Sequence, residues 1–569
     1  MEDEINKAFD KAEKIGVIGS PSSTNALSVD VLGTAIDKKL VGALCLFKHM
    51  QDGKEHFSLG QITEITLKNS WSEDPTMRSL IRQKGRVDPI TEKQDTHTAS
   101  MIVSSVFSKI DSTTMGPSML GTVPSTGSPI KLMNNEVMDG LLGSYKDQLS
   151  YLGRAYGSDI MLPMWFKQFN KSTTGVGEAY HIGVFGKTGS GKSVLAKMIM
   201  LSYAKHPTMS IFVIDPQGEL SGDFEKDAKL KAYVKDNLKR DVQVINLKHL
   251  VLTYKIDLFM KLLFYSKFFD KLAIYNEDNK IRTFNMIMPL LKAYKPWDYW
   301  KREAFNIVWN AFDNDTTLAQ MYTGLEYRER TRSARNSADV EEFYTLWEGI
   351  TNLFKFDSSG SKIQIKTIAE GITKDLDKGK MTIVDLSELN ATENIMWNDD
   401  IKAVVIKDLI DRLKEQSEEL YKQGKSLNTL VVIDEAHRLA PAQTDNEDLK
   451  AVRLSLVDAV RTTRKSGLGW MFISQTLSSL DVEILKQLRA YILGFGLGWG
   501  FELQTLRGII GGNKEAIRLY QLFRDPQSSF GDKEYPFMMV GPLSPLSFAS
   551  IPMFFNAVGY PDDFINLNK

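Results

Sequence analysis

The chain has 569 residues, of which 70 are Lys or Arg and 71 are Asp or Glu, so its formal net charge is −1. This length exceeds what one hydrophobic core supports and predicts two to four domains. The single cysteine, Cys45, excludes an intramolecular disulfide and a zinc site built from cysteines. The balanced charge excludes a uniformly basic DNA-binding protein, but it permits a small basic surface inside a ring. The acidic start is not a signal peptide, and no run of about 18 uncharged apolar residues occurs, so we expect a soluble cytoplasmic protein with no membrane partner.

The N-terminal part of the chain has the pattern of a small β-rich domain. After a short helix, residues 15–135 consist of short runs rich in Val, Ile, Phe and Thr, which Gly, Pro, Ser and Asp clusters separate. This close spacing predicts a β-barrel rather than a βαβ unit. Residues 136–180 contain polar, Gly-rich stretches that indicate a connection to the next part of the chain.

The segment HIGVFGKTGSGKSVLAK, residues 181–197, predicts a strand, a glycine-rich turn and a helix that begins at Lys192. It contains the G-x-x-x-x-G-K-S pattern, in which backbone N–H groups and a helix N-terminus bind a polyphosphate. Lys192 would reach the β- and γ-phosphates, and Ser193 would ligate Mg²⁺. The candidate nucleotide-binding residues are Gly186, Lys187, Thr188, Gly189, Ser190, Gly191, Lys192 and Ser193.

From this loop onward, strands and helices alternate, which predicts an α/β fold with a parallel sheet. The apolar strand at 211–214 ends in Asp215, which would lie near a metal ion and the attacking water, or would simply start a turn. The strand at 430–433 ends in Asp434 and Glu435. We expect Asp434 to hold Mg²⁺ through water and Glu435 to polarise the hydrolytic water.

The strand LGWMFISQ ends in Ser474 and Gln475. An amide at this position suits a γ-phosphate sensor, because it can hydrogen-bond both phosphate and water; a cap of the strand end is the alternative. A last strand is expected at AYILGFGLG. The C-terminal segment, rich in Pro and aromatic residues, would be either an arm that packs on a neighbour or an ordinary closing strand.

Residues 256–375 look like a largely helical insertion. Its aromatic residues Phe305, Trp309 and Phe312 occur at helical spacing and are expected in a core rather than in a base-stacking platform. Four arginines are concentrated in YRERTRSARNS. They would form a solvated helix face or, alternatively, a nucleic-acid contact.

These motifs together resemble the HerA branch of the HerA–FtsK superfamily of RecA-like ring ATPases. The segments that carry the resemblance are HIGVFGKTGSGKS, FVIDPQGE, LVVIDEAHRLAP and RKSGLGWMFISQ, in the family's order. The resemblance implies a RecA-like P-loop core that binds ATP and Mg²⁺. It implies Glu435, Lys192, Gln475 and Arg464 as catalytic residues, with Arg464 as an arginine finger. Gln217 stands where the family usually carries His.

We accordingly predict five regions. They are a barrel domain at 1–150, the first part of the RecA-like core with the phosphate loop at 151–255, the insertion at 256–375, the second part of the core at 376–545, and a C-terminal arm at 546–569.

The resemblance also implies partners: a homo-hexamer, double-stranded DNA, and a separate effector such as a NurA-like nuclease or a sirtuin-like protein, in end processing or antiviral defence. We expect residues 15–135 to dock that effector. The leading hypothesis is a DNA translocase or helicase driven by ATP. Two alternatives stay open: a conjugation or secretion ATPase of the VirB4 type, and a nucleotide-bound ring scaffold that assembles and licenses an effector.

Overall fold

The computed structural model describes residues 2–85, 94–111, 114–172, 174–356, 362–373, 375–388, 395–528, 531, 533–547 and 551–569. The chain forms two compact units. Unit 1 comprises Met1–Val176, Tyr180–Lys205 and Met471–Lys569, and unit 2 comprises Gly177–Ala179 and His206–Trp470. Within the described ranges, no helix combines the length and the apolar character that a membrane span needs.

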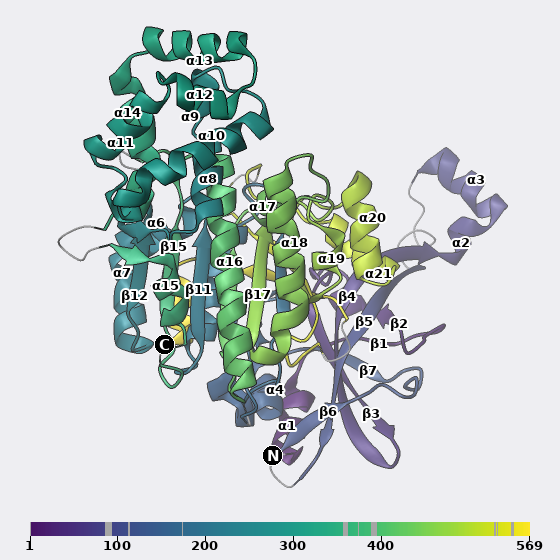
Figure 1. Ribbon diagram of the computed structural model, residues 1–569. Coiled ribbons are helices and arrows are strands. Elements are labelled where there is room, and N and C mark those ends of the chain that lie inside the picture. Colours follow the sequence, from purple (N-terminus) through teal and green to yellow (C-terminus); the bar gives the residue numbers. More distant parts are fainter. Residues whose placement is uncertain are drawn as a thin grey trace. The chain divides into compact units, whose positions relative to one another are not determined.

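The N-terminal part of unit 1 is a closed antiparallel barrel, as predicted (Figure 1). Its strand order is β2-β1-β7-β3-β4-β5, and β2 also pairs with β5, which closes the ring. Apolar side chains on the inner face, such as Ile15, Val29 and Phe47, are fully buried. The strands are β1 (Lys14–Ile18), β2 (Leu27–Val31), β3 (Leu44–Gln51), β4 (Lys54–Asn69), β5 (Asp95–Lys109), the flanking β6 (Met115–Ser118) and β7 (Pro129–Leu132).

Along the chain, helices precede, interrupt and follow the strands of the barrel. The short helices α2 and α3 follow β4, a position where we predicted only strands and turns. Asp74 caps α3, because its carboxylate accepts hydrogen bonds from the N–H groups of Thr76 and Met77 at 2.9 and 3.1 Å. These helices are α1 (Glu2–Lys11), α2 (Ser70–Glu73), α3 (Pro75–Lys84) and α4 (Asn135–Leu142).

The rest of unit 1 is built on a mixed sheet with the order β17-β10-β18-β19-β20-β8-β9. Strand β10 pairs in parallel with β17 and β18, and the later pairs are antiparallel. The strands are β8 (Ser150–Ala155), β9 (Met161–Met164), β10 (His181–Phe185), β17 (Leu468–Ser474), β18 (Leu488–Gly494), β19 (Pro536–Val540) and β20 (Met553–Ala557). The helices are α5 (Lys192–Ala204), α19 (Val482–Leu485), α20 (Gly500–Ile509), α21 (Lys514–Gln521) and α22 (Asp562–Asn568).

Two segments form strands of this sheet where the sequence predicted a connection or left two alternatives open. Residues 136–180, predicted as a connection, contain β8 and β9. Near the C-terminus, β20 pairs with both β19 and β8, so this segment is a closing strand of its own chain's sheet. The pairing of β20 with β8 joins parts of the chain that are far apart in sequence, which local patterns do not reveal. The boundaries of the five predicted regions stay predictions.

Unit 2 contains a parallel sheet with the order β12-β15-β11-β16. Because the strands are parallel, their carboxyl ends meet at one edge of the sheet. Helices α16 and α18 pack side by side over this sheet (Figure 1). The strands are β11 (Ser210–Asp215), β12 (Val242–Asn246), β15 (Met381–Asp385) and β16 (Thr429–Ile433); the helices are α6 (Glu219–Lys226), α7 (Ala228–Ala232), α16 (Asp399–Lys422), α17 (Ala436–Leu439) and α18 (Glu447–Thr462).

The insertion is helical, as predicted, and Figure 1 shows helices α8 to α14 (teal) clustered beyond the ends of β11 and β15, whereas α15 lies beside the sheet. Phe305, Trp309 and Phe312 are buried, which confirms their expected place in a core. The helices are α8 (Ile256–Tyr265), α9 (Phe268–Lys271), α10 (Glu277–Leu290), α11 (Arg302–Ala311), α12 (Asp315–Met321), α13 (Leu325–Ser337), α14 (Val340–Thr351) and α15 (Ile365–Gly371); the short strands β13 (Leu250–Val251) and β14 (Ile363–Gln364) pair with each other.

The arginines of α13 all have partners inside unit 2. Arg332 forms ion pairs with Glu329, Asp313 and Asp315. Arg335 pairs with Asp313 and lies over the ring of Trp309. Arg328 donates to the Tyr322 carbonyl at 2.7 Å, and Arg330 lies over the ring of Tyr275. This arrangement favours the solvated helix face over a nucleic-acid contact.

Candidate functional site: the phosphate loop and the acidic strand ends

The phosphate loop joins the fully buried strand β10 to helix α5 in unit 1. Gly189 and Gly191 have φ of +81° and +86°, backbone conformations that residues with a Cβ rarely adopt. Gly191 is the N-cap of α5 and offers no side chain to its first N–H groups. An uncapped helix N-terminus behind a glycine-rich turn is suited to bind an anion.

The side chain of Lys192 is buried and contacts the backbone of this loop. Its ammonium donates a hydrogen bond of 3.1 Å to the carbonyl of Lys187. The hydroxyl of Ser190 is also buried and has no hydrogen-bond partner among the described residues. A buried ammonium and a buried hydroxyl in one loop are polar groups that a phosphate oxygen would satisfy.

Gln475 directly follows β17 and contacts the phosphate loop. Its amide oxygen accepts a hydrogen bond of 3.1 Å from the hydroxyl of Thr188. Strands β17 and β10 pair in parallel, with Ser474 opposite Phe185, so both chains leave the sheet at the same level. The structure therefore brings the predicted sensor to the predicted phosphate loop.

Asp215 ends β11 in unit 2, and its carboxylate is fully buried. One oxygen accepts from the N–H groups of Gln217 and Gly218, and the other from those of Leu220 and Ser221 at 2.9 and 2.8 Å. Burial raises the pKa of Asp215, and the hydrogen bonds from Ser221 and Gly218 oppose this effect. The carboxylate thus organises the start of α6, which favours the turn-starting interpretation, and its role toward a nucleotide stays a prediction.

Asp434 and Glu435 follow the buried strand β16. One oxygen of Asp434 accepts a hydrogen bond of 2.9 Å from the N–H of Glu435, while Oδ2 is buried with no hydrogen-bond partner among the described residues. Burial raises the pKa of Asp434 to about 7, and the nearby carboxylates of Asp215, Glu435 and Glu219 add to the rise. A buried carboxylate oxygen among other acids is a position that a cation would stabilise.

Glu435 has an unusual backbone conformation, with φ of +47°. Such left-handed conformations cost free energy in a residue other than glycine and occur frequently at functional sites. Its carboxylate lies 3.3 Å from Nδ1 of His437. The main chain therefore holds this acid in a defined position at the carboxyl end of the sheet.

These oxygens fit Mg²⁺, which usually binds through one or two carboxylates together with phosphates and water. The described residues contain no group of three or more His, Cys, Asp or Glu side chains arranged to hold a metal by themselves. The unpartnered Oδ2 of Asp434 supplies one hard oxygen ligand of the required kind.

Arg464 lies in unit 2, just beyond the C-terminal end of α18. Helix α18 ends at Thr462, and Arg464 follows in a 3₁₀ turn that ends at Gly467, whose φ is +77°. Its Nε lies 3.1 Å from Oε2 of Glu178, and its carbonyl accepts from the N–H of Ala179. Both side chains of the ion pair are about half exposed, with 54% and 49% of their surface accessible.

Comparison with known proteins relates one region of the chain to a family. Residues 179–413 match the family model described as "Helicase HerA, central domain". This region of the chain is similar to the HerA central domain. The matched HerA region contains the phosphate loop, Asp215 and the helical insertion, whereas Asp434, Glu435, Arg464 and Gln475 lie C-terminal to it. No curated protein matches the chain in a sequence comparison.

Three solved structures match the chain in a structural comparison. VirB4 of Thermoanaerobacter pseudethanolicus is 14% identical, with 73% of this chain and 97% of that chain covered and a TM-score of 0.37. The genome packaging NTPase B204 from Sulfolobus turreted icosahedral virus 2, in complex with AMPPCP, is 12% identical, with 67% and 98% covered and a TM-score of 0.28. The pCW3 conjugation coupling protein TcpA is 11% identical, with 92% and 93% covered and a TM-score of 0.30. At these TM-scores the likenesses do not bear on function.

Two residues that contact the candidate site residues or their loops were missed in the sequence. Asp385 ends β15 opposite Asp215 and accepts a hydrogen bond of 2.7 Å from the Ser221 hydroxyl. The apolar run before Asp385 was the available signal, because it matches the runs before Asp215 and Asp434. Gln217, which was singled out in the sequence, accepts hydrogen bonds from the guanidinium of Arg438 at 2.8 and 3.3 Å when its amide oxygen is turned toward that side chain.

The second missed residue is Glu502 on α20 of unit 1. Its carboxylate accepts hydrogen bonds from the N–H groups of Leu477 and Ser478, the first at 2.7 Å. These residues lie just beyond Gln475, so Glu502 stabilises the loop that carries the sensor. No local pattern around Glu502 signals this contact, because the two segments are separated by a strand and a helix.

Proposed function

We propose that this chain is an ATP-hydrolysing motor that moves double-stranded DNA through a homo-hexameric ring and acts with a separate effector protein. The observation that carries the proposal is the phosphate loop, with its uncapped helix N-terminus and buried Lys192, inside a region that matches the HerA central domain. Lys192 and the N–H groups of the loop would bind the β- and γ-phosphates.

The remaining residues would take the roles expected in phosphoryl transfer. Ser193 and Asp434 would hold Mg²⁺, which when bound neutralises charge on the phosphates. Glu435 would orient the attacking water and accept its proton, and Gln475 would hydrogen-bond the γ-phosphate. Arg464 would stabilise charge on the phosphoryl group bound by a neighbouring subunit, since its guanidinium is held at the surface by Glu178 and not in a core.

The effector is proposed to be a nuclease or a NurA-like or sirtuin-like protein that docks on the barrel at residues 15–135. The barrel contains none of the candidate nucleotide residues, so its surface is available for a partner. Purification of the tagged chain from its native source, followed by mass spectrometry, would identify the effector. A partner retained by a chain with substituted barrel loops would place the docking surface elsewhere.

The motor itself is tested by ATP turnover of the assembled protein with and without linear duplex DNA. We expect turnover to require Mg²⁺ and to rise several-fold when duplex DNA is added, because a translocase couples hydrolysis to movement on its substrate. An ATPase rate that duplex DNA leaves unchanged would contradict the motor and would favour the ring scaffold that licenses an effector.

A further inference from the structure

The segment 494–502, which leads from the end of β18 into the first turn of α20, contacts the phosphate loop in unit 1. The N–H of Lys187 donates a hydrogen bond of 2.9 Å to the carbonyl of Phe495. Gly496 has φ of +100°, and a Cβ at this position would come within 2.2 Å of Cγ of Lys187. Glycine therefore lets the segment pack directly on the phosphate loop.

Tyr520 of α21 fixes the conformation of the same segment. Its hydroxyl donates a hydrogen bond of 2.6 Å to the carbonyl of Gly494 and accepts one of 3.0 Å from the N–H of Leu497. Burial raises the pKa of Tyr520, the hydrogen bond from Leu497 opposes this rise, and the negative charge of Glu502 adds to it. The phenol thus stays protonated and keeps its bond to Gly494.

Glu502, at the other end of the segment, binds the sensor loop, which we define as residues 475–478. Its Oε2 accepts a hydrogen bond of 2.7 Å from the N–H of Leu477. Its Oε1 accepts from the N–H of Ser478 at 3.2 Å and from the hydroxyl of the same residue. A carboxylate that accepts three hydrogen bonds from two consecutive residues restricts the backbone just beyond Gln475.

The position of Gln475 is therefore set from two sides. The hydroxyl of Thr188 binds its amide oxygen directly, and Glu502 holds the residues that follow it. The segment 494–502 also ties the sensor loop to the phosphate loop, because its two ends contact one loop each. An amide that must donate to a phosphate or a water depends on such placement, since an error of about 1 Å can cost roughly 100-fold in rate.

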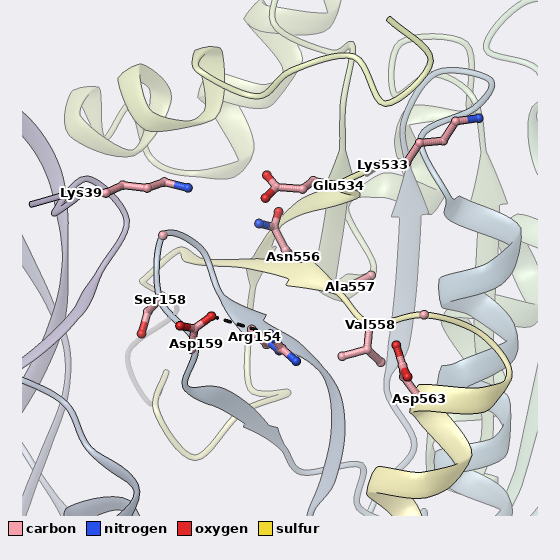
Figure 2. Close-up of a pocket in the computed structure, with 12 residues that line it drawn as sticks. Lys39, Arg154, Ser158, Asp159, Lys533, Glu534, Asn556, Ala557, Val558 and Asp563 are labelled. Carbon is pink, nitrogen blue, oxygen red and sulfur yellow. Dashed lines mark ion pairs between the residues drawn. The ribbon is translucent and has the colours of Figure 1, made fainter. Parts of the chain in front are cut away.

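Glu534 offers a comparison within the same unit. It lines a polar cavity of about 600 Å³, which Figure 2 shows together with other lining residues such as Lys39 and Arg154. The described residues that line this cavity include none from the sensor loop or from the segment 494–502. Removing the Glu534 carboxylate therefore changes an acid of unit 1 without removing any of the contacts described above.

We propose that Glu502 is a positioning residue for the γ-phosphate sensor, an inference that rests on the proposed ATP hydrolysis. Its carboxylate holds Leu477 and Ser478 so that the amide of Gln475 faces the γ-phosphate and the attacking water. Glu502 itself contacts neither of them and acts through Gln475. Its loss accordingly lowers the rate of hydrolysis and leaves nucleotide affinity unchanged.

The test measures kcat and KM for ATP, and the Kd of a non-hydrolysable ATP analogue, on the full-length protein with Mg²⁺. We expect Glu502→Ala to lower kcat about tenfold, because the sensor is displaced but still present, and to leave the Kd unchanged. Glu502→Gln keeps an oxygen that can accept from the N–H of Leu477 and should restore most of the rate. Glu502→Asp is one methylene shorter and should be as slow as Glu502→Ala. Glu534→Ala is the matched control and should keep the native kcat.

A double substitution distinguishes positioning from a general effect on the fold. If Glu502 acts through Gln475, Glu502→Ala should cause no further loss of kcat in the Gln475→Ala background. The inference is overturned by a native kcat in Glu502→Ala, or by an equal loss of kcat in the two backgrounds. It is also overturned if Glu502→Gln is no faster than Glu502→Asp, a comparison that still decides should Glu502→Ala prove unfolded in a melting experiment. A native chain that does not hydrolyse ATP would instead contradict the proposed function itself.

Discussion

The hydroxyl of Thr188 donates a hydrogen bond of 3.1 Å to the amide oxygen of Gln475, which connects the phosphate loop to the strand end on which the sensor lies. The two residues are 287 positions apart in the chain, and the parallel pairing of β10 with β17 brings them together. The contact with Thr188 uses the amide oxygen of Gln475, whereas the amide nitrogen carries the donor hydrogens that a phosphate oxygen or a water could accept.

A first prediction follows from this contact. Gln475→Ala should lower kcat about 100-fold with little change in nucleotide affinity, because a positioned donor acts mainly on the transition state. Thr188→Val removes only the hydroxyl that orients the amide and should cost far less. Steady-state kinetics with a separate Kd measurement distinguish the two effects. Native kcat in Gln475→Ala would remove Gln475 from the catalytic set.

Lys192 and Glu435 should differ in the step they affect. Lys192→Ala should abolish nucleotide binding, since the buried ammonium is the main cation of the loop. Glu435→Gln should bind nucleotide normally and stop turnover, because the amide keeps the shape but cannot accept a proton from water. Glu447→Gln, which changes an exposed glutamate at the start of α18, is the control and should retain activity. Substantial hydrolysis by Glu435→Gln would show that another residue activates the water.

Arg464 should complete the active site of the neighbouring subunit. We expect Arg464→Ala to lower turnover by about 10³-fold or more, as for other arginine fingers. Mixing Arg464→Ala protomers with Glu435→Gln protomers should restore some hydrolysis, because some interfaces then combine an intact arginine with an intact glutamate. Mixed rings that form and are as inactive as either parent would contradict a role in trans. Arg461 lies three residues earlier, on the last turn of α18, and is the alternative candidate for the arginine finger; Arg461→Ala tests it.

Glu178 should act on turnover only through Arg464. The ion pair between them is half exposed, so its contribution to stability is small, about 0 to 1 kcal/mol. Glu178→Gln should therefore leave the melting temperature nearly unchanged and should release the guanidinium, giving turnover equal to or above the native rate. The same substitution in the Arg464→Ala background should have no further effect on turnover. An independent effect there would assign Glu178 a different role.

Binding to DNA should depend on salt and not on sequence. Because the protomer has almost no net charge, contacts with phosphates must come from a few basic residues repeated by symmetry. Affinity for duplex DNA should fall steeply between about 50 and 200 mM salt and should require the assembled ring. Fluorescence anisotropy over this range measures the slope. A flat response would exclude phosphate contacts as the source of binding.

Gln61 should be a stability determinant that links the barrel to the sheet of unit 1. Its amide donates to the carbonyls of Gly42 and Phe554 at 2.9 Å, and its oxygen accepts from the N–H of Phe554 at 2.8 Å. Gln61→Leu leaves these buried backbone groups unsatisfied and should destabilise the protein by about 2 to 5 kcal/mol. Thr66→Val, which removes an exposed hydrogen bond in the same strand, is the control. Equal melting temperatures for the two variants would contradict this role.

The features determined by the sequence alone are those in which a short segment carries its own pattern. The phosphate loop needs glycines at positions of positive φ, and the G-x-x-x-x-G-K-S spacing shows them directly. Buried strands that end in Asp434 and Glu435 are visible as apolar runs followed by acids. The barrel and the helical insertion were predictable from the spacing of apolar residues, because burial of one face imposes a period on the chain.

Only the tertiary structure shows which segments far apart in the sequence contact one another. Asp215 follows a buried strand as Asp434 does, yet its oxygens are occupied by the start of α6, whereas Oδ2 of Asp434 has no such partner among the described residues. The closing strand β20, the contact of Tyr535 with Gly191 and the buried bonds of Gln61 all join residues far apart in sequence. Hydrogen bonds and close packing depend on distance in space, and the order of residues along the chain does not encode these partners locally.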